Sequence, residues 1–216
     1  MPEIGLVAFG GDLKPERLIA AYRVGIFPWY NNDPILWWSP DPRCVLFPQK
    51  FRPSRSLRKS IRKNGYRFTL DRAFGEVIRH CARPHLGPDE TWINSDMIDA
   101  YSEMHRRGYA HSVETWQGRR LVGGLYGIAM GRVFFGESMF STETDASKGA
   151  LVYLVDRLLE FGYMLIDCQV TSAHLLSIGA EEIPREAFMR ILGREVGKDG
   201  IPGFWAPDRD AGGGES

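Results

Sequence analysis

The sequence has few of the residues that build metal sites and disulfide frameworks. Its three cysteines, Cys44, Cys81 and Cys168, are an odd number with no C-x-x-C spacing, so the pattern indicates neither paired disulfides nor a zinc site. The five histidines show no H-x-H or H-E-x-x-H arrangement. We therefore expect no metal site, and we expect the thiols to be reduced and structural.

Long apolar runs are also missing. No stretch approaches the roughly 20 consecutive apolar residues of a membrane span, and the start MPEIGLVAF lacks the basic region and apolar core of a signal peptide. The hydrophobic content of 44% nevertheless suffices for a sizeable core in 216 residues. We expect a globular protein with no membrane partner and a cytoplasmic location.

Charge is balanced overall but unevenly distributed. The segment 50–67, KFRPSRSLRKSIRKNGYR, holds eight basic residues and no acid, although the whole chain has 27 of each. Ser54 can cap a helix here, and Asn64-Gly65 can end it. This predicts a short basic helix that carries Arg55, Arg58, Lys59, Arg62 and Lys63. Such a helix suits a phosphate backbone, and a solvated face is the alternative.

The order of elements indicates an α/β (α+β) protein. A Gly-, Pro- and Trp-rich start predicts a small N-terminal subdomain over 1–60, with one helix in PERLIAAYRVG. Two amphipathic helices, a meander of antiparallel strands, a long helix, the strand YMLIDCQ and a short helix follow over 61–196. The Gly-rich tail, 197–216, is expected to be poorly ordered.

The apolar run MLIDCQV, residues 164–170, carries two polar groups at its end. Side chains alternate along a strand, so Asp167 and Gln169 share one face while Cys168 points to the other. Burying a carboxylate and an amide is costly unless each finds a partner. The two groups are therefore either a satisfied polar pair or part of a site.

Several long runs resemble the leucyl/phenylalanyl-tRNA:protein transferase family over roughly residues 5 to 192. In order they are GGDL, YRVGIFPWY, DPILWWSPDPR, TWI, HSVE, LVGGLYG, GESMFS, ASK, LIDCQV and GAEEIPR. The resemblance implies a small N-terminal domain packed on a GNAT-like acyltransferase domain. It also implies transfer of leucine or phenylalanine, and sometimes methionine, from aminoacyl-tRNA to proteins with an N-terminal Arg or Lys, which marks them for degradation.

The resemblance assigns residues to this reaction. Gln169 and Asp167 would handle the proton step, and Glu137 would be a second acid in the same pocket. The tRNA 3′ end would meet Trp29 and Trp92, with Tyr22 and Tyr101 as weaker candidates. An apolar pocket for the aminoacyl side chain would be formed by Leu125, Phe134, Met139, Leu154 and Leu158. No cofactor is implied, because the ester carries the energy.

The residues suggest how the proton could move. A neutral amide oxygen is a weak base, so we expect Asp167 to accept from the Gln169 amide and make its carbonyl more negative. Alternatively, Gln169 only orients the amine, and water or the departing ribose oxygen takes the proton. Phe134 and Glu137 are three residues apart and should face opposite ways, so a bulge at Gly136 is predicted.

Two other functions compete with this interpretation. A GNAT-like domain could use acetyl-CoA, but the matching segment STETDASKGA lacks the Q/R-x-x-G-x-G/A turn that cradles pyrophosphate. A noncatalytic RNA-binding module would explain the basic segment and leave Glu137, Asp167 and Gln169 without a role. The sequence also offers no nucleophile, since GESMF is not a G-x-S-x-G elbow.

Overall fold

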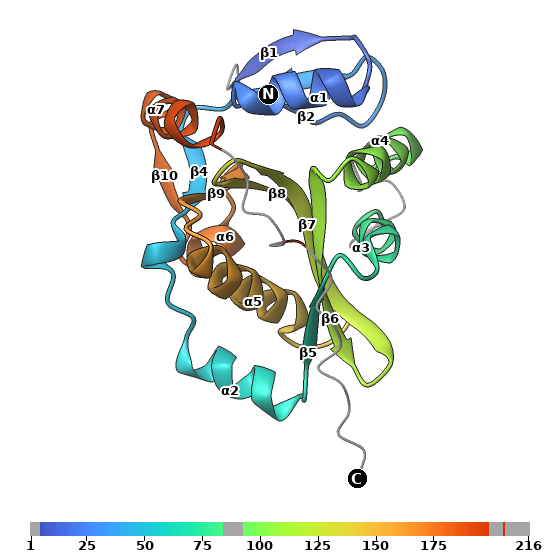
Figure 1. The fold of residues 1–216 in the computed structure, drawn as a ribbon, viewed down its shortest axis with the longest axis vertical. Coiled ribbons are helices and arrows are strands. Elements are labelled where there is room, and N and C mark those ends of the chain that lie inside the picture. The colour runs from blue at the N-terminus through green and yellow to red at the C-terminus, as the bar shows by residue number, and fades with distance from the viewer. Residues whose placement is uncertain (1–4, 84–92, 199–204, 206–216) are drawn as a thin grey trace.

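The computed structural model describes residues 5–83, 93–198 and 205. Its backbone forms two β-sheets with helices packed around them (Figure 1). The smaller sheet has the order β1-β3-β2 and is antiparallel. Its strands are β1 (Leu6–Phe9), β2 (Phe27–Pro28) and β3 (Leu36–Trp38), and helix α1 (Pro15–Arg23) packs beside them.

The larger sheet has seven strands in the order β10-β4-β9-β8-β7-β6-β5. Every neighbouring pair is antiparallel except β8 and β9, which run parallel. The strands are β4 (Arg43–Leu46), β5 (Arg67–Leu70), β6 (Ala110–Gln117), β7 (Arg120–Met130), β8 (Val133–Ser141), β9 (Leu165–Gln169) and β10 (Glu181–Ile183). The mixed sheet confirms the predicted fold class.

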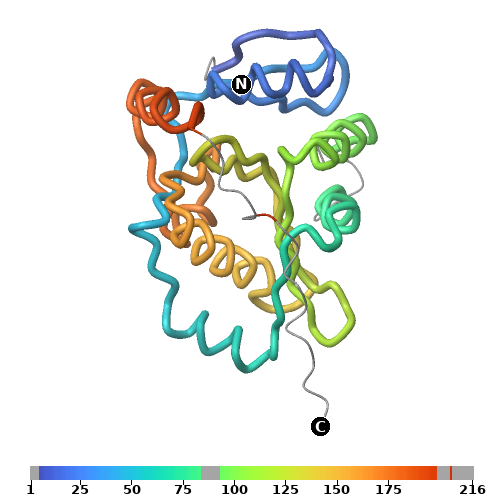
Figure 2. The backbone as a smooth tube through the Cα atoms, in the orientation of Figure 1, coloured from blue at the N-terminus to red at the C-terminus, as the bar shows by residue number. Residues whose placement is uncertain are grey.

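Helices cover both faces of the large sheet. Helices α3 (Phe74–Cys81) and α4 (Ser95–Arg106) lie on one face, and α5 (Ala146–Glu160) lies on the other (Figure 1). The short helix α6 (Ala173–Ser177) follows β9, and α7 (Arg185–Glu195) follows β10. Figure 2 shows the small sheet across the same end of the large sheet as α4 and α7. The buried side chains form two clusters, one on each side of the large sheet.

The local signals in the sequence explain several of these elements. Pro15 starts α1, where its missing N–H costs nothing, and Leu18 and Tyr22 form its buried side. Ser54 accepts from the backbone N–H of Leu57 over 3.1 Å and so caps α2 (Arg55–Lys63), as expected. The predicted helices α1, α3, α4, α5 and α6 and the β6–β8 meander are all present.

The two sheets divide the chain differently from the predicted ranges. The small sheet uses residues up to Trp38, and β4 already belongs to the large sheet although it lies within 1–60. The 3-10 helix η1 (Pro48–Lys50) and α2 connect β4 to β5. Most of the predicted tail lies outside the described residues. None of the helices in the described part is long and apolar enough to cross a membrane.

Candidate active site

The site forms where β8 and β9 part. Their parallel pairing runs from Val133 opposite Leu165 to Phe135 opposite Asp167 and then stops. On the other side of β8, Tyr126 pairs with Ser138 and Gly127 with Gly136, so Glu137 is left without a partner. Strand parity predicted a bulge at Gly136, and the structure has the extra residue one position later, at Glu137. The Glu137 side chain therefore projects from the open end of the parallel pair.

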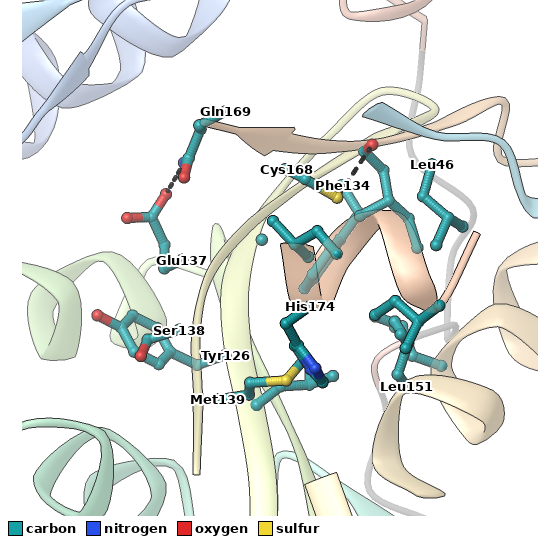
Figure 3. A pocket seen from close by; sticks show the side chains of 16 residues that line it. Leu46, Tyr126, Phe134, Glu137, Ser138, Met139, Leu151, Cys168, Gln169 and His174 are labelled. Atoms are coloured by element: carbon teal, nitrogen blue, oxygen red, sulfur yellow. Dashed lines mark hydrogen bonds between the residues drawn. The ribbon is translucent and has the colours of Figure 1, made fainter. Parts of the chain in front are cut away.

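Gln169 ends β9 with an unusual backbone. Its φ of 62° lies in the left-handed region, which a residue with a side chain rarely adopts. The backbone N–H of Gln169 donates to Oδ1 of Asp167 over 3.0 Å. Its side-chain amide donates to Oε1 of Glu137 over 2.9 Å (Figure 3). The turn thus directs the amide away from β9 and toward the bulge.

Asp167 has a different partner from the one expected. Its two oxygens accept from Nε and an Nη of Arg43 over 2.8 and 2.6 Å, and both side chains are buried. The prediction that Asp167 accepts from the Gln169 amide is therefore wrong, because that amide faces Glu137. The hydrogen bond between Asp167 and Gln169 comes from the backbone N–H of Gln169 and not from its side chain. Cys168 packs on the opposite face, as strand parity required.

Of the two site acids, Glu137 is the one whose hydrogen-bond partners among the described residues are all neutral. Besides the Gln169 amide, the hydroxyl of Tyr22 contacts it over 2.6 Å and that of Tyr101 over 3.1 Å, and the two hydroxyls also contact each other. Each phenol has a single O–H hydrogen, so the two tyrosines donate in two of these three contacts at a time. Burial raises the pKa of Glu137 to about 7, although these hydrogen bonds oppose the shift. A carboxyl with this pKa can exchange a proton near neutral pH.

Tyr22 and Tyr101, the weaker candidates for the tRNA 3′ end, are buried in the structure. Both side chains are fully buried beneath Glu137, and burial raises the pKa of each phenol well above 10.0. The structure therefore shows these tyrosines as buried hydrogen-bond partners of Glu137. Trp92, the other aromatic residue assigned to that end, lies outside the described residues.

An apolar cavity of about 270 Å³ opens beside this group. Of the five predicted pocket residues, Leu125, Phe134, Met139 and Leu154 line it. Leu158 does not line it, and this side chain is fully buried in the cluster around α5. Side chains that the sequence did not single out complete the wall, as Figure 3 shows for some of them: Leu46, Tyr126, Ser138, Leu151, Ile166, Cys168, His174, Leu175 and Ile178.

Glu137 and Gln169 also face a second hollow. This hollow, of about 220 Å³, is lined by Phe27, Pro28 and Trp29 on one side and by residues 170–172 on the other. Trp29 is 40% exposed, and its ring lies 5.9 Å from that of Trp38. Because Cys168, Gln169 and Glu137 line both hollows, they stand where the two meet.

The basic helix lies on the surface at some distance along α5. Its apolar residues Leu57 and Ile61 pack against the α5 cluster, while its five predicted cations are all exposed. None of the five forms an ion pair with a described residue. Beside the helix, a polar groove of about 610 Å³ includes Lys50, Arg52 and Lys148. This face is therefore free to meet an anionic partner.

One group in the described part of the chain has donor atoms close enough to hold a metal ion. In Asp71, His105 and His111 these atoms lie within 4.8 Å of one another. His111 already contacts Asp71 over 2.7 Å and the Gly108 carbonyl over 3.1 Å, and His105 contacts the Ala110 carbonyl over 2.8 Å. These contacts tie β6 to the loop after β5, so we assign the group a structural role.

Comparison with known proteins identifies the family. Residues 45–193 match the model of the leucyl/phenylalanyl-tRNA protein transferase family, and residues 11–41 match the model of its N-terminal domain. The leucyl/phenylalanyl-tRNA–protein transferase of Syntrophobacter fumaroxidans is 60% identical over 194 residues, which cover 89% of this chain and 83% of the relative. That of Stutzerimonas stutzeri is 61% identical over 189 residues, covering 87% and 84%.

Among solved structures, the chain is remotely similar to L-PGS from Bacillus licheniformis. The TM-score is 0.45 with 12% identity, and the match covers 86% of this chain and 71% of that one. Sequence identity to the curated relatives is far stronger and extends over both sheets. The chain belongs to the leucyl/phenylalanyl-tRNA protein transferase family and is an aminoacyltransferase.

Proposed function

We propose that the chain moves leucine or phenylalanine, and also methionine, from aminoacyl-tRNA to the α-amine of proteins that begin with Arg or Lys. The products would carry a degradation signal, and the reaction would take place in the cytoplasm, where charged tRNA is available. The observation that carries this proposal is the pair Glu137 and Gln169 at the junction of an apolar cavity and a hollow beside an exposed tryptophan.

The donor ester would lie across this junction. Its amino-acid side chain would enter the apolar cavity between α5 and the parted strands, where Leu125 and Phe134 supply buried apolar surface. The terminal adenosine would stack on Trp29, since an indole on the surface can hold a splayed base. The ester carbonyl would then lie close to Gln169. Farther away, the cations of α2 would bind the phosphate backbone of the tRNA.

The acceptor would be attracted by Glu137. Asp167 is neutralised by Arg43, so of the two acids only Glu137 offers unpaired negative charge in the described part of the site. An N-terminal ammonium, or the side chain of a first Arg or Lys, is positively charged and would be favoured there. This preference is electrostatic, so a neutral first residue should be a weaker acceptor.

The reaction needs one bond to form and one to break. The neutral amine nitrogen attacks the ester carbonyl carbon, an amide forms, and the bond to the ribose oxygen breaks. The carbonyl oxygen of Gln169 accepts from none of the described residues, so it can hold an N–H of the amine while its own NH₂ stays bonded to Glu137. Glu137, with a pKa of about 7, can take the proton that nitrogen loses and return it to the ribose oxygen.

Holding the two substrates together would supply much of the acceleration. Pre-ordered reactants can gain on the order of 7 to 11 kcal/mol over the bimolecular reaction at best. An aminoacyl ester is already activated, and an α-amine with a pKa of about 7.7 to 8.0 is partly neutral at cell pH. Positioning and one proton transfer therefore suffice, and the reaction needs no covalent intermediate on the protein.

A transfer assay tests the proposal. Labelled leucine on tRNA is incubated with the protein alone and a peptide that begins with Arg, and a peptide that begins with Ala serves as the control. We expect label to appear on the first peptide and to be nearly absent from the second. If neither peptide is labelled, the proposed activity is wrong. If both are labelled equally, the acceptor preference is wrong.

A further inference from the structure

The buried pair Arg43 and Asp167 is not used by any step of the proposed reaction. Arg43 is 1% exposed and Asp167 is fully buried, so neither side chain can reach a substrate. Moving two charges out of water is expensive, and such a pair often adds little net stability. Its position next to Gln169 therefore calls for another explanation.

Arg43 is held from both sides by aromatic rings. Its guanidinium carbon lies 5.0 Å from the centroid of the Phe27 ring and 4.5 Å from that of the Phe188 ring. Phe27 belongs to the small sheet and is two residues from Trp29, and Phe188 belongs to α7. One Nη atom of Arg43 has no hydrogen-bond partner in the described part of the chain, so ring contacts take the place of polar ones on that side.

Asp167 connects Arg43 to the backbone of Gln169. Its Oδ1 accepts from Nε of Arg43 over 2.8 Å and from the backbone N–H of Gln169 over 3.0 Å. That second bond fixes the backbone of Gln169 at φ 62°, a conformation that costs a residue with a side chain about 1 to 3 kcal/mol. An extended Gln169 would continue β9 and could not direct its amide to Glu137 in the same way.

We infer that Arg43 is a positioning residue for transfer: through Asp167 it holds Gln169 in the left-handed turn that places the side-chain amide on Glu137. The catalytic importance of that amide rests on the proposed function. The placement itself does not, and it can be observed without any assay. Because Phe27 and Trp29 are on the same short segment, Arg43 also joins the tryptophan hollow to the turn that bears Gln169.

A crystal structure of Arg43→Lys tests the placement. Lysine keeps the charge but cannot form the paired contact with both oxygens of Asp167. We expect Gln169 to leave the left-handed region or its amide to leave Glu137. An unchanged Gln169 would overturn the inference, whatever the protein catalyses. Arg185→Lys is the matched control, because Arg185 joins α7 to the carbonyl of Ser39 over 2.8 Å and is not bonded to Asp167.

Kinetics then separate positioning from simple stability. Per folded molecule, Arg43→Lys should lower kcat on the order of 10²-fold and leave the Kd for tRNA unchanged, since a displaced reacting group costs about that much. In a Gln169→Ala background the same change should add less than about twofold, because Arg43 acts through Gln169. A normal kcat in Arg43→Lys, or losses that multiply in the double variant, would each contradict the inference.

A second variant covers the case in which Arg43→Lys does not fold. Arg43→Met combined with Asp167→Leu removes both charges and leaves neither unpaired. It should fold, lose the Asp167 acceptor, and have a kcat as low as that of Gln169→Ala. If it folds and transfers at the normal rate, Arg43 positions nothing. If the wild-type protein transfers no leucine, the proposed function fails, and the crystallographic comparison still decides the placement of Gln169.

Discussion

Leu154 and Leu158 lie one turn apart on α5 and are both fully buried, yet only Leu154 lines the apolar cavity. Leu158 packs into the cluster behind it. Two leucines with equal burial on one helix therefore differ in whether they meet the donor, which gives the cavity assignment a matched control.

Replacing Leu154 with Ala should change the choice of donor. Each of Leu154→Ala and Leu158→Ala should lower the free energy of unfolding by about 2 to 5 kcal/mol, since both remove a buried side chain. Only Leu154→Ala enlarges the cavity, so it alone should favour phenylalanyl-tRNA over leucyl-tRNA. The ratio of kcat/KM for the two donors measures this. A shift of similar size in Leu158→Ala would show that the ratio reports loosened packing.

A β-branched donor should be a poor substrate. Isoleucine has the same number of carbons as leucine but carries a methyl group next to the backbone, which in the proposed pose lies at the junction lined by Glu137, Cys168 and Gln169. One misplaced methyl group is worth about 1 to 3 kcal/mol, so isoleucyl-tRNA should react roughly 10- to 200-fold more slowly. Competition between the two labelled donors in one tube gives the ratio directly. Equal rates would contradict this placement of the donor.

The transfer rate should depend on pH through Glu137. Its pKa is raised to about 7, and only the ionised form can accept a proton, so below that pH this group alone should lower the rate about tenfold per unit. The amine must also be neutral, so the observed rate should fall about a hundredfold per unit there. The acceptor amine, with a pKa of about 7.7 to 8.0, adds a second inflection above it. Glu137→Gln should therefore be slow and should keep only the inflection of the amine. Two inflections in the variant would remove Glu137 from the proton step.

Glu137 should also make stability depend on pH. Its pKa rises from 4.5 in the unfolded chain to about 7 in the folded one, so the folded state binds the proton more tightly. This contribution is complete below about pH 4.5 and is lost as the pH rises through 7. Relative to Glu137→Gln, the wild type should thus lose up to about 3 kcal/mol between these limits. Denaturant titrations at several pH values measure the difference, and parallel curves would contradict the burial of this charge.

The elements of the fold follow from local signals in the sequence, whereas the pairing of polar groups does not. Apolar spacing, the Ser54 cap and strand alternation predict the helices, the meander and the opposite faces of Cys168 and Asp167. Even the bulge beside Glu137 could be predicted from parity. All of these features depend on residues that are close together in the chain.

The partner of Asp167 could not be found in this way. Arg43 is 124 positions away and meets Asp167 only because β4 inserts beside β9 in the large sheet. Tyr22 and Tyr101 likewise reach Glu137 from α1 and α4, across two separate packing interfaces. A pattern along the chain shows which residues are polar and buried, but their contacts are set by tertiary packing.

Trp29 should contribute to the binding of the donor's 3′ end. The residue is 40% exposed and borders the hollow next to Gln169. Trp29→Ala should therefore weaken the binding of a short aminoacyl-adenosine donor by roughly 1 to 3 kcal/mol. Trp29→Phe keeps an aromatic face and should restore part of the affinity. Calorimetry on the wild type and the two Trp29 variants measures the affinity for this donor. An alanine variant with full affinity would leave Trp29 a packing partner of Trp38 only.

The cations of α2 should bind the body of the tRNA through its phosphates. Affinity should fall steeply with salt and change little among tRNA bodies that carry the same amino acid, because counterion release is independent of sequence. Replacing Arg58, Lys59 and Arg62 with Ala should weaken binding and reduce the slope of log K against log salt by about 2 to 3. The thermal midpoint should hardly change, since all three side chains are exposed.

A second triple variant separates this site from general charge. Arg23, Arg119 and Arg194 are also exposed, and they lie on or beside α1, the β6–β7 turn and α7. Replacing them with Ala removes the same net charge from three other parts of the surface. We expect the salt slope and the affinity for tRNA to stay close to those of the wild type. If both triple variants lose affinity equally, the whole surface attracts tRNA and α2 has no special role. If neither triple variant loses affinity for tRNA, the five cations of α2 form an ordinary solvated face.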